Sequence, residues 1–433
     1  MPRAATPVRA GGLRRIVIDV SPLRETPAYR WLWVGSLLNN AGSQVTQLAL
    51  PFQIYVLTGS VLAVGGLAAV RLAALICFAL PGGSLADAYD RRKLLLAAQL
   101  AGAATSLVLA FLAFSDDPPL WAIYAVAFVG TGLSTIDGPT RRAVVIELVG
   151  ARRMASAVVL EQAGSQAASI FGPALGGVLI AALGLPIAYL IDAATFAASL
   201  AAALALPSMR PEGGGSRPGL SSVLEGLRFA RQVPVILSGF VVDLDAMIFG
   251  MPVALFPILA VTTLHGGATE LGLLTAAPAV GALVGALTTG WLSGVRHQGR
   301  VVLASVALWG IGICAFGLSS AWLAGGLVCL AVAGWADVIS AVMRATIVQT
   351  VTPDRLRGRL SALHALVVTG GPRLGDMEAT AVAAVVGAPA SVVLGGVLCL
   401  VGLVIVHRRF PQLAAYDAGE VLSQGPGPEP ASA

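Results

Sequence analysis

Gly82-Gly-Ser-Leu-Ala-Asp-Ala-Tyr-Asp-Arg-Arg-Lys93 is a short charged segment between two long apolar stretches, residues 61–82 and 93–114. Each stretch has about the 20 residues that an α-helix needs to cross the hydrocarbon core of a membrane. The bilayer core offers no water to satisfy backbone polar groups, so stretches of this kind fold as helices. The segment is therefore predicted to connect two membrane-spanning helices.

The same alternation of apolar stretch and polar connection continues along the whole chain. Hydrophobic residues make up 57% of the 433 residues, charged residues only 11%, and the mean hydropathy is +0.84. A soluble domain carries about 25% charged residues, so this composition excludes a soluble enzyme and a disordered or fibrous chain. We predict an all-α polytopic membrane protein. Its twelve spans are expected at residues 31–57, 61–82, 93–114, 120–141, 154–182, 185–206, 233–262, 269–294, 300–318, 322–348, 359–385 and 388–407.

Among the connections between spans, only every second one carries Lys or Arg. Arginines and one lysine lie at residues 91–93, 152–153, 210–231, 296–300 and 355–359 and at both ends of the chain, whereas the alternate connections contain neither residue type. Short loops that carry Lys and Arg stay in the cytoplasm, so both termini are predicted to be cytoplasmic. This topology explains the formal net charge of +5, and no nucleic-acid partner is expected.

The chain divides into two similar halves. The stretch from Gly132 to Arg142 matches the stretch from Gly334 to Arg344, and Gly172-Pro-Ala-Leu-Gly176 matches Gly371-Pro-Arg-Leu-Gly375. Matches in the same order indicate an internal duplication, and a repeat of six plus six spans is one way in which secondary transporters are built. The predicted organisation is a cytoplasmic N-terminal segment 1–30, a six-helix bundle 31–206, a cytoplasmic linker 207–232, a second six-helix bundle 233–407 and a cytoplasmic tail 408–433.

The opening segment resembles the loop motif of the major facilitator superfamily, a family of alternating-access transporters. The residues on its key positions are Gly83, Leu85, Asp87, Arg91 and Arg92, while Ala88 and Asp90 depart from the family pattern. Glycine lets two helices approach closely, and an aspartate can cap a helix or pair with an arginine. The resemblance implies the major facilitator fold and a gating latch that holds one conformational state. The alternative is an ordinary charged turn that follows the topology rule.

A second motif lies in the fifth apolar stretch. Gly172, Pro173, Gly176 and Gly177 resemble the antiporter motif of the same superfamily, with Ala168 in place of its leading glycine. Proline removes a backbone donor and bends a helix, and glycines let a neighbouring helix pack closely. In the family this pattern accompanies export. The alternative is a kink that serves packing alone.

Ionisable residues within apolar stretches are the third signal. A charge at the bilayer centre costs roughly 2.5–3.5 kcal/mol, so such a residue is expected to face a cavity or a partner. Arg373 and Asp376 are three residues apart on one predicted helix and can pair, whereas the two aspartates at 243 and 245 point to opposite sides of theirs. The candidate cavity charges or proton-coupling residues are Arg71, Glu161, Asp243, Asp245, Arg373, Asp376 and Glu378. For each residue, the alternative is a structural bond between helices.

Four longer stretches are similar to the bacterial siderophore exporters typified by the enterobactin exporter: residues 21–30, 273–290, 328–335 and 350–359. The resemblance implies proton-driven export of a siderophore or similar amphipathic small molecule across the bacterial inner membrane. We expect a monomer without enzymatic activity, cofactor or metal site. Two alternatives stay open, a multidrug efflux transporter and a non-transporting membrane scaffold or receptor.

Overall fold

The computed structural model describes residues 19–209 and 220–417, except for the side chains of residues 79–88, 220–223, 293 and 354–355. Within these residues the chain is helical and contains no β-strand. The first helices are α1 (Ser21–Glu25), α2 (Pro27–Thr58), α3 (Val61–Ala88), α4 (Arg91–Phe114), α5 (Leu120–Val149), the short η1 (Ala151–Arg153) and α6 (Met154–Leu204). They are followed by α7 (Leu220–Gln232), α8 (Pro234–Phe249), η2 (Val253–Leu255), α9 (Phe256–Ile258), η3 (Leu259–Thr263), α10 (Ala268–Thr288), η4 (Thr289–Gly294), α11 (Gln298–Leu318), α12 (Leu323–Val351), α13 (Asp354–Val386), α14 (Ala388–Arg409) and α15 (Pro411–Ala415).

Two of the long helical segments are interrupted. The helix α6 changes direction at Gly184, whose φ of 83° lies in the left-handed region that glycine adopts without a steric penalty. The α8 helix ends at Phe249, and the chain passes through the non-helical residues Gly250, Met251 and Pro252 before helical structure resumes. Proline lacks a backbone N–H and restricts the residue before it, so a continuous helix is disfavoured at that point.

Nine helical segments of the described chain are long and apolar enough to cross a membrane, by length and composition. One of them covers Ala151–Leu204 and so contains the break at Gly184. The helices α2 and α13 are not among the nine, because polar residues recur along α2 and charged residues along α13. The expected twelve spans therefore stay a prediction.

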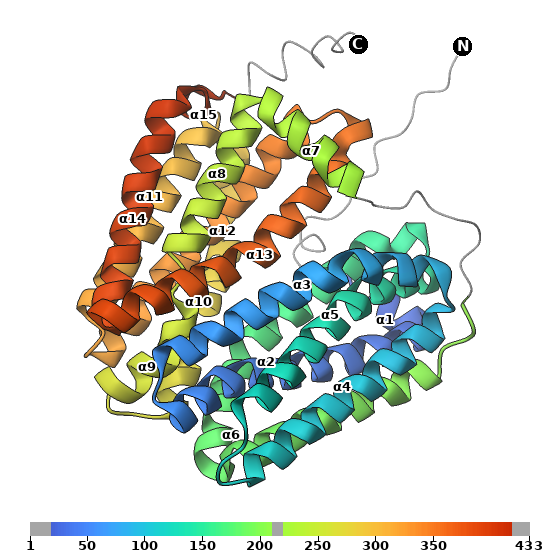
Figure 1. The fold of residues 1–433 in the computed structure, drawn as a ribbon. Coiled ribbons are helices and arrows are strands. Elements are labelled where there is room, and N and C mark those ends of the chain that lie inside the picture. Colours follow the sequence, from blue (N-terminus) through green and yellow to red (C-terminus); the bar gives the residue numbers. More distant parts are fainter. Residues whose placement is uncertain (1–18, 210–219, 418–433) are drawn as a thin grey trace, which may run out of the picture.

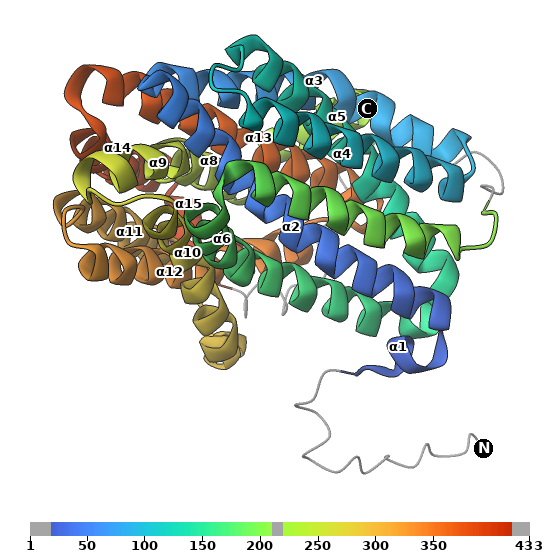
Figure 2. The same ribbon diagram turned by 90° about the horizontal axis from the view of Figure 1, so that it is seen from below.

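The helices form two groups that lie against each other (Figure 1). In the first group, α6 packs against α2 and α4, and α3 packs against α5. In the second group, α12 packs against α10 and α11, and α14 packs against α11. The most extensive contacts between the groups are those of α6 with α10 and of α3 with α13, and α2 also contacts α9 and α10. The view from below shows α2 and α6 running alongside each other (Figure 2).

We call the side of the molecule with the connections at 89–91, 149–154, 294–298 and 351–354 the arginine end, and the other side the opposite end. The two groups meet toward the opposite end. There Gly65, near the start of α3, lies directly against Thr380, near the end of α13. Figure 1 shows these two helices side by side near α9 and diverging toward α7.

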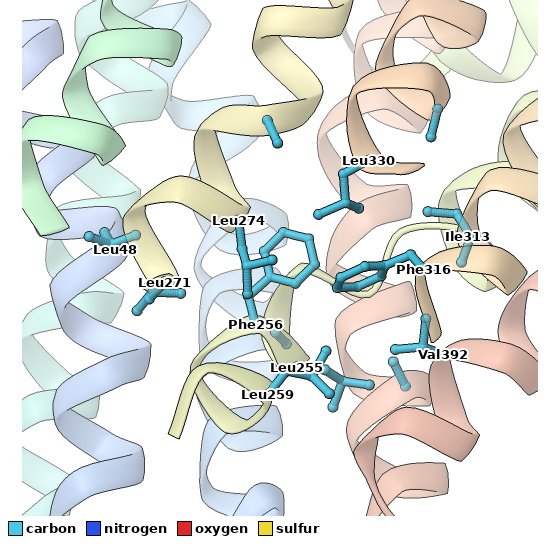
Figure 3. Packing of buried hydrophobic residues seen from close by; sticks show 14 of the residues in the cluster. Leu48, Leu255, Phe256, Leu259, Leu271, Leu274, Ile313, Phe316, Leu330 and Val392 are labelled. Carbon is cyan, nitrogen blue, oxygen red and sulfur yellow. The ribbon is translucent and has the colours of Figure 1, made fainter. Parts of the chain in front are cut away.

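A continuous cluster of buried apolar side chains crosses this junction (Figure 3). It contains Leu48 of α2 together with Leu271 and Leu274 of α10. Further into the second group, the rings of Phe256 and Phe316 meet edge to face with centroids 5.8 Å apart. Apolar packing thus joins the two groups near the opposite end, and the polar features described next lie beside it.

Candidate functional site

A cavity of about 110 Å³ lies where the two groups of helices meet. We call it the central cavity. Its walls come from α2, α3 and α6 of the first group and from η2, α9, α10 and α13 of the second. Its charged lining residues are Arg71 of α3 and Arg373 and Asp376 of α13. The fold therefore brings Arg71 together with Arg373 and Asp376, the two candidates expected to pair on one helix.

A larger cavity of about 440 Å³ lies within the first group, between α2, α4, α5 and α6. It shares Gln47, Arg71 and Arg373 with the central cavity. The two arginines consequently stand where both cavities meet. A molecule in either cavity could reach them.

The carboxylate of Asp376 has two partners in the central cavity. It accepts a hydrogen bond from the backbone N–H of Ala254 at 3.0 Å, and its Oδ2 atom lies 3.6 Å from Nη1 of Arg373. The pairing expected for Arg373 and Asp376 is thus present. Arg71 forms no hydrogen bond or ion pair with any described residue. The central cavity therefore holds two arginines and one carboxylate.

Asp192 is a further buried carboxylate, in the wall of the larger cavity. The hydroxyls of Thr46 and Ser106 donate to its Oδ2 atom at 2.6 and 2.7 Å. These donors compensate part of the cost of burying the carboxylate. Asp192 carries the same sequence signal as the other candidates, an ionisable residue within an apolar stretch, for which the alternative interpretation is a rim position near a helix end.

The two aspartates of α8 point to different neighbours, as their spacing predicted. Asp243 is buried, and its Oδ1 atom lies 2.7 Å from Nη2 of Arg344 on α12, whose Nη1 donates to the Ser340 hydroxyl. Asp245 lies against Gly402 of α14. Arg344 was missed by sequence reasoning, although it occupies the position in the second half that matches Arg142 in the first. Neither aspartate lines the central cavity.

The remaining acidic candidates are not part of the central cavity. Glu161 of α6 and Glu378 of α13 are both half-buried, and neither lines the central or the larger cavity. Helical position decides this outcome for Glu378, because it is two residues from Asp376 and therefore faces away from it.

The gating-loop motif is described only in part. The side chains of Gly83, Leu85 and Asp87 lie outside the described residues, so the latch stays a prediction. Arg91 pairs with Glu147 of α5 at 2.8 Å, and Arg92 donates to the Leu204 carbonyl oxygen at 2.8 Å. Both bonds are made within the first group of helices, and they hold the start of α4 against its neighbours.

Asp90, which departs from the family motif, has a clear local role. Its side chain accepts hydrogen bonds from the backbone N–H groups of Arg92 and Lys93 and so caps the N-terminus of α4. The Ser208 hydroxyl also donates to it, and these bonds hold the pKa of the Asp90 carboxyl below its usual range. The connection is thereby tied to the chain that follows α6.

The antiporter-like motif lies at the junction of the two groups. Gly172 and Gly176 pack against α2, while Gly177 faces α10. A Cβ atom at Gly177 would lie 2.4 Å from the carbonyl oxygen of Ala268, a distance that requires the backbone to shift. Pro173 lines the central cavity. The motif therefore allows a close contact between α6 and α10 beside the cavity.

Comparison with known proteins also identifies membrane transporters as the relatives of this chain. A family model described as "Transmembrane secretion effector" matches residues 18–432. Enterobactin exporter EntS of Citrobacter koseri is 30% identical over 407 residues, which cover 92% of this chain and 96% of that protein. The exporter of the same name from Shigella flexneri is 30% identical over 413 residues, covering 93% and 98%.

Solved structures of low sequence identity share the fold. A bacterial homologue of the human lysosomal transporter Spinster has a TM-score of 0.70 at 14% identity, covering 91% of this chain and 99% of that one. A bacterial homologue of the iron transporter ferroportin has a TM-score of 0.69 at 14% identity, covering 90% and 99%. With the family match over nearly the whole chain, this likeness identifies the protein as a multi-pass transporter of the bacterial inner membrane, not an enzyme, that belongs to the transmembrane secretion effector family of the major facilitator superfamily.

Proposed function

We propose that this transporter exports a catecholate siderophore, or a similar amphipathic small molecule, by proton-driven alternating access. The observation that carries the proposal is the central cavity, which lies between the two groups of helices and is lined by Arg71, Arg373 and Asp376. A site shared by two rigid bundles can be exposed to each side of the membrane in turn when the bundles rock. The 30% identity to proteins named enterobactin exporter supports the choice of substrate.

The proposed topology has twelve spans. These are the nine apolar segments, α2, α13 and a second span from α6, which is divided at Gly184. The arginine end is then cytoplasmic, as are both termini. The described parts of the expected cytoplasmic segments, residues 19–30, 207–209, 220–232 and 408–417, lie at that end, and the rest of the segments 1–30, 207–232 and 408–433 is outside the described residues. Residues 31–206 and 233–407 are then the two bundles.

In this orientation the structure represents a state that takes up substrate from the cytoplasm. Tight contacts, such as Gly177 against Ala268 and Gly65 against Thr380, join the bundles toward the periplasmic end. Export requires these contacts to separate while others form toward the cytoplasmic end. The gating-loop motif lies at the cytoplasmic end of α3, where the proposed latch, with Asp87 at its centre, would act.

Proton coupling is assigned to carboxylates that are paired with arginines. Protonation of Asp243 neutralises it and weakens its bond to Arg344, and the same holds for Asp376 and Arg373. Each pair can therefore switch between a bonded and a released arrangement. Glu161, Asp245 and Glu378 are the other candidates, and none of them forms an ion pair with an arginine among the described residues.

Complementation tests the substrate. The gene is expressed under iron starvation in a bacterial host whose own enterobactin exporter has been deleted, and enterobactin is measured in cells and medium. We expect the gene to restore release, and Asp376→Asn to reduce it while the protein stays in the membrane. If enterobactin release stays as low as in the deletion host without the gene, but drug susceptibility falls, multidrug efflux would be favoured. Purified protein that moves neither substrate nor protons in liposomes would favour a scaffold or receptor.

A further inference from the structure

We infer that the central cavity binds its substrate through a negatively charged group held between Arg71 of the first bundle and Arg373 of the second. The chemical class is a small molecule with a carboxylate or a deprotonated catechol. This inference rests on the proposed function, because it takes the central cavity to be the substrate site, and it adds the charge that the site selects.

Arg71 is the first reason. It lies in the middle of α3, and the other residues that α3 contributes to the central cavity, Val64, Leu67 and Ala68, are apolar. No described residue forms an ion pair or hydrogen bond with it. Asp376 attracts this guanidinium only from beyond hydrogen-bond distance. A guanidinium away from bulk water that makes no hydrogen bond is costly, so its persistence in an apolar helix indicates a hydrogen-bonding partner that is not part of the chain.

Arg373 is the second reason. Its distance of 3.6 Å from Asp376 is longer than the roughly 2.7–2.9 Å of a good charge-assisted hydrogen bond. Asp376 also accepts a hydrogen bond from the Ala254 backbone, which holds it toward η2. Arg373 has five N–H donors, and its side chain is 31% exposed. Donors of Arg373 therefore remain available to a molecule in the cavity.

The placement of the two arginines gives the site a mechanical consequence. Arg71 belongs to α3 and Arg373 to α13, and these two helices form one of the most extensive contacts between the bundles. Their positive charges repel each other across the cavity, and Asp376 offsets only part of that repulsion. An anion between the two arginines replaces the repulsion with attraction. Bound anion therefore stabilises the arrangement in which the two bundles are close together. A neutral molecule of the same shape has no such effect.

The test compares two probes that differ in charge. The full-length protein is purified in nanodiscs, and binding of 2,3-dihydroxybenzoate and of the neutral 2,3-dihydroxybenzamide is measured by calorimetry at neutral pH. We expect the wild-type protein to prefer the benzoate. Arg71→Gln and Arg373→Gln should each weaken benzoate binding by about ten- to a hundredfold, the effect of losing a hydrogen bond to a charged group. Binding of the benzamide should change little.

Two controls separate loss of charge from loss of fold. Arg228→Gln removes an exposed arginine of α7 outside both cavities and should leave both affinities unchanged. Arg71→Lys and Arg373→Lys keep the positive charge and should retain part of the preference for benzoate. They replace the glutamine variants in the test if those fail to fold. Equal binding of the two probes to wild-type protein overturns the inference, and release of enterobactin in the complementation assay then shows that the proposed export still holds. A benzoate preference without such release would contradict the export proposal alone.

Discussion

At the residue scale, the pair Asp243–Arg344 shows how this protein accommodates full charges inside an apolar bundle. The carboxylate and guanidinium are 2.7 Å apart, and their side chains are only 3% and 9% exposed. The Ser340 hydroxyl accepts a hydrogen bond from another N–H group of Arg344. Each charge thus depends on the other for its compensation, and the pair joins α8 to α12.

This dependence predicts a non-additive response to mutation. Asp243→Asn leaves Arg344 buried without a carboxylate, and Arg344→Gln leaves the aspartate uncompensated; each should destabilise the protein by on the order of 3–5 kcal/mol. The double variant should recover part of that loss, because no unpaired charge remains. Thermal unfolding of the four proteins in detergent measures the coupling. Additive effects of the two substitutions would show that the pair is not energetically coupled.

The cap formed by Asp90 predicts a pH-dependent stability. Asp90→Ala should cost about 1 kcal/mol at neutral pH, since two backbone N–H groups of α4 lose their acceptor. The pKa of Asp90 is lowered in the folded protein, so its stabilising effect is present above the unfolded value, about 3.9, and is lost as the pH falls through the folded value. The difference in melting temperature between wild type and variant should therefore shrink below about pH 4.

Asp117→Ala serves as the control for this effect, because Asp117 is exposed and the α5 helix that follows it has no side-chain capping hydrogen bond. This variant should have the melting temperature of the wild type both at neutral pH and below about pH 4. A pH-independent difference between wild type and Asp90→Ala would contradict the role of the carboxylate charge.

At the residue scale, the sequence could identify candidate site residues only through the rarity of charged side chains within apolar stretches. Arg71, Arg373 and Asp376 were found because charges within apolar stretches are costly and therefore conspicuous. The same signal also selected Glu161 and Glu378, which do not line the central cavity. The missing information is the rotation of each helix about its axis, which is set by packing against other helices rather than by local sequence.

At the element scale, the contact between α6 and α10 depends on the absence of side chains on both helices. A Cβ atom at Gly177 would lie 2.4 Å from the Ala268 carbonyl oxygen, and one at Gly272 would lie 2.5 Å from the Pro173 carbonyl oxygen. Small residues of this kind let membrane helices approach closely. The motif predicted from the sequence is thus placed at the junction between the bundles, beside the central cavity.

Substitution at this contact should change the balance between conformational states. Gly177→Leu should prevent the close approach of α6 and α10, so that the two bundles separate at the opposite end and export falls severely. Accessibility of a cysteine introduced at Leu271 to a membrane-impermeant thiol reagent, in a background without the four native cysteines, measures that opening. Gly239→Ala is the matched control, because no atom lies within 4 Å of a Cβ placed there. Equal reactivity in all variants would contradict the proposed role of the contact.

The helices themselves were predictable to a large degree, because an apolar stretch in a membrane has few alternatives to a helix. The division of α6 near Gly184 follows the expected boundary between residues 182 and 185. The interruption at Gly250–Pro252 was not expected, since residues 233–262 were predicted as one span. Composition indicates that a segment is helical, but a proline break becomes visible only when the local geometry is considered.

At the scale of the whole molecule, the inferred anion site between Arg71 and Arg373 makes export sensitive to the membrane potential. An anion that leaves a cell with a negative interior moves down the electrical gradient. The potential contributes about 2.3 kcal/mol per elementary charge at 100 mV, which corresponds to about a fifty-fold concentration ratio. Export of an anion would therefore be favoured by the membrane potential in addition to any proton gradient.

The dependence on potential gives a prediction for the assembled transporter. Proteoliposomes are loaded with 2,3-dihydroxybenzoate, and a potassium gradient with valinomycin sets the interior negative, neutral or positive at constant pH. Efflux should be fastest with a negative interior and slowest with a positive one, because the substrate carries its charge outward. Efflux of the neutral 2,3-dihydroxybenzamide should not follow the potential, and Arg71→Gln should lower the benzoate rate at every potential. Equal benzoate rates at all three potentials would show that transport moves no net charge, and would contradict export of the anion in exchange for entering protons.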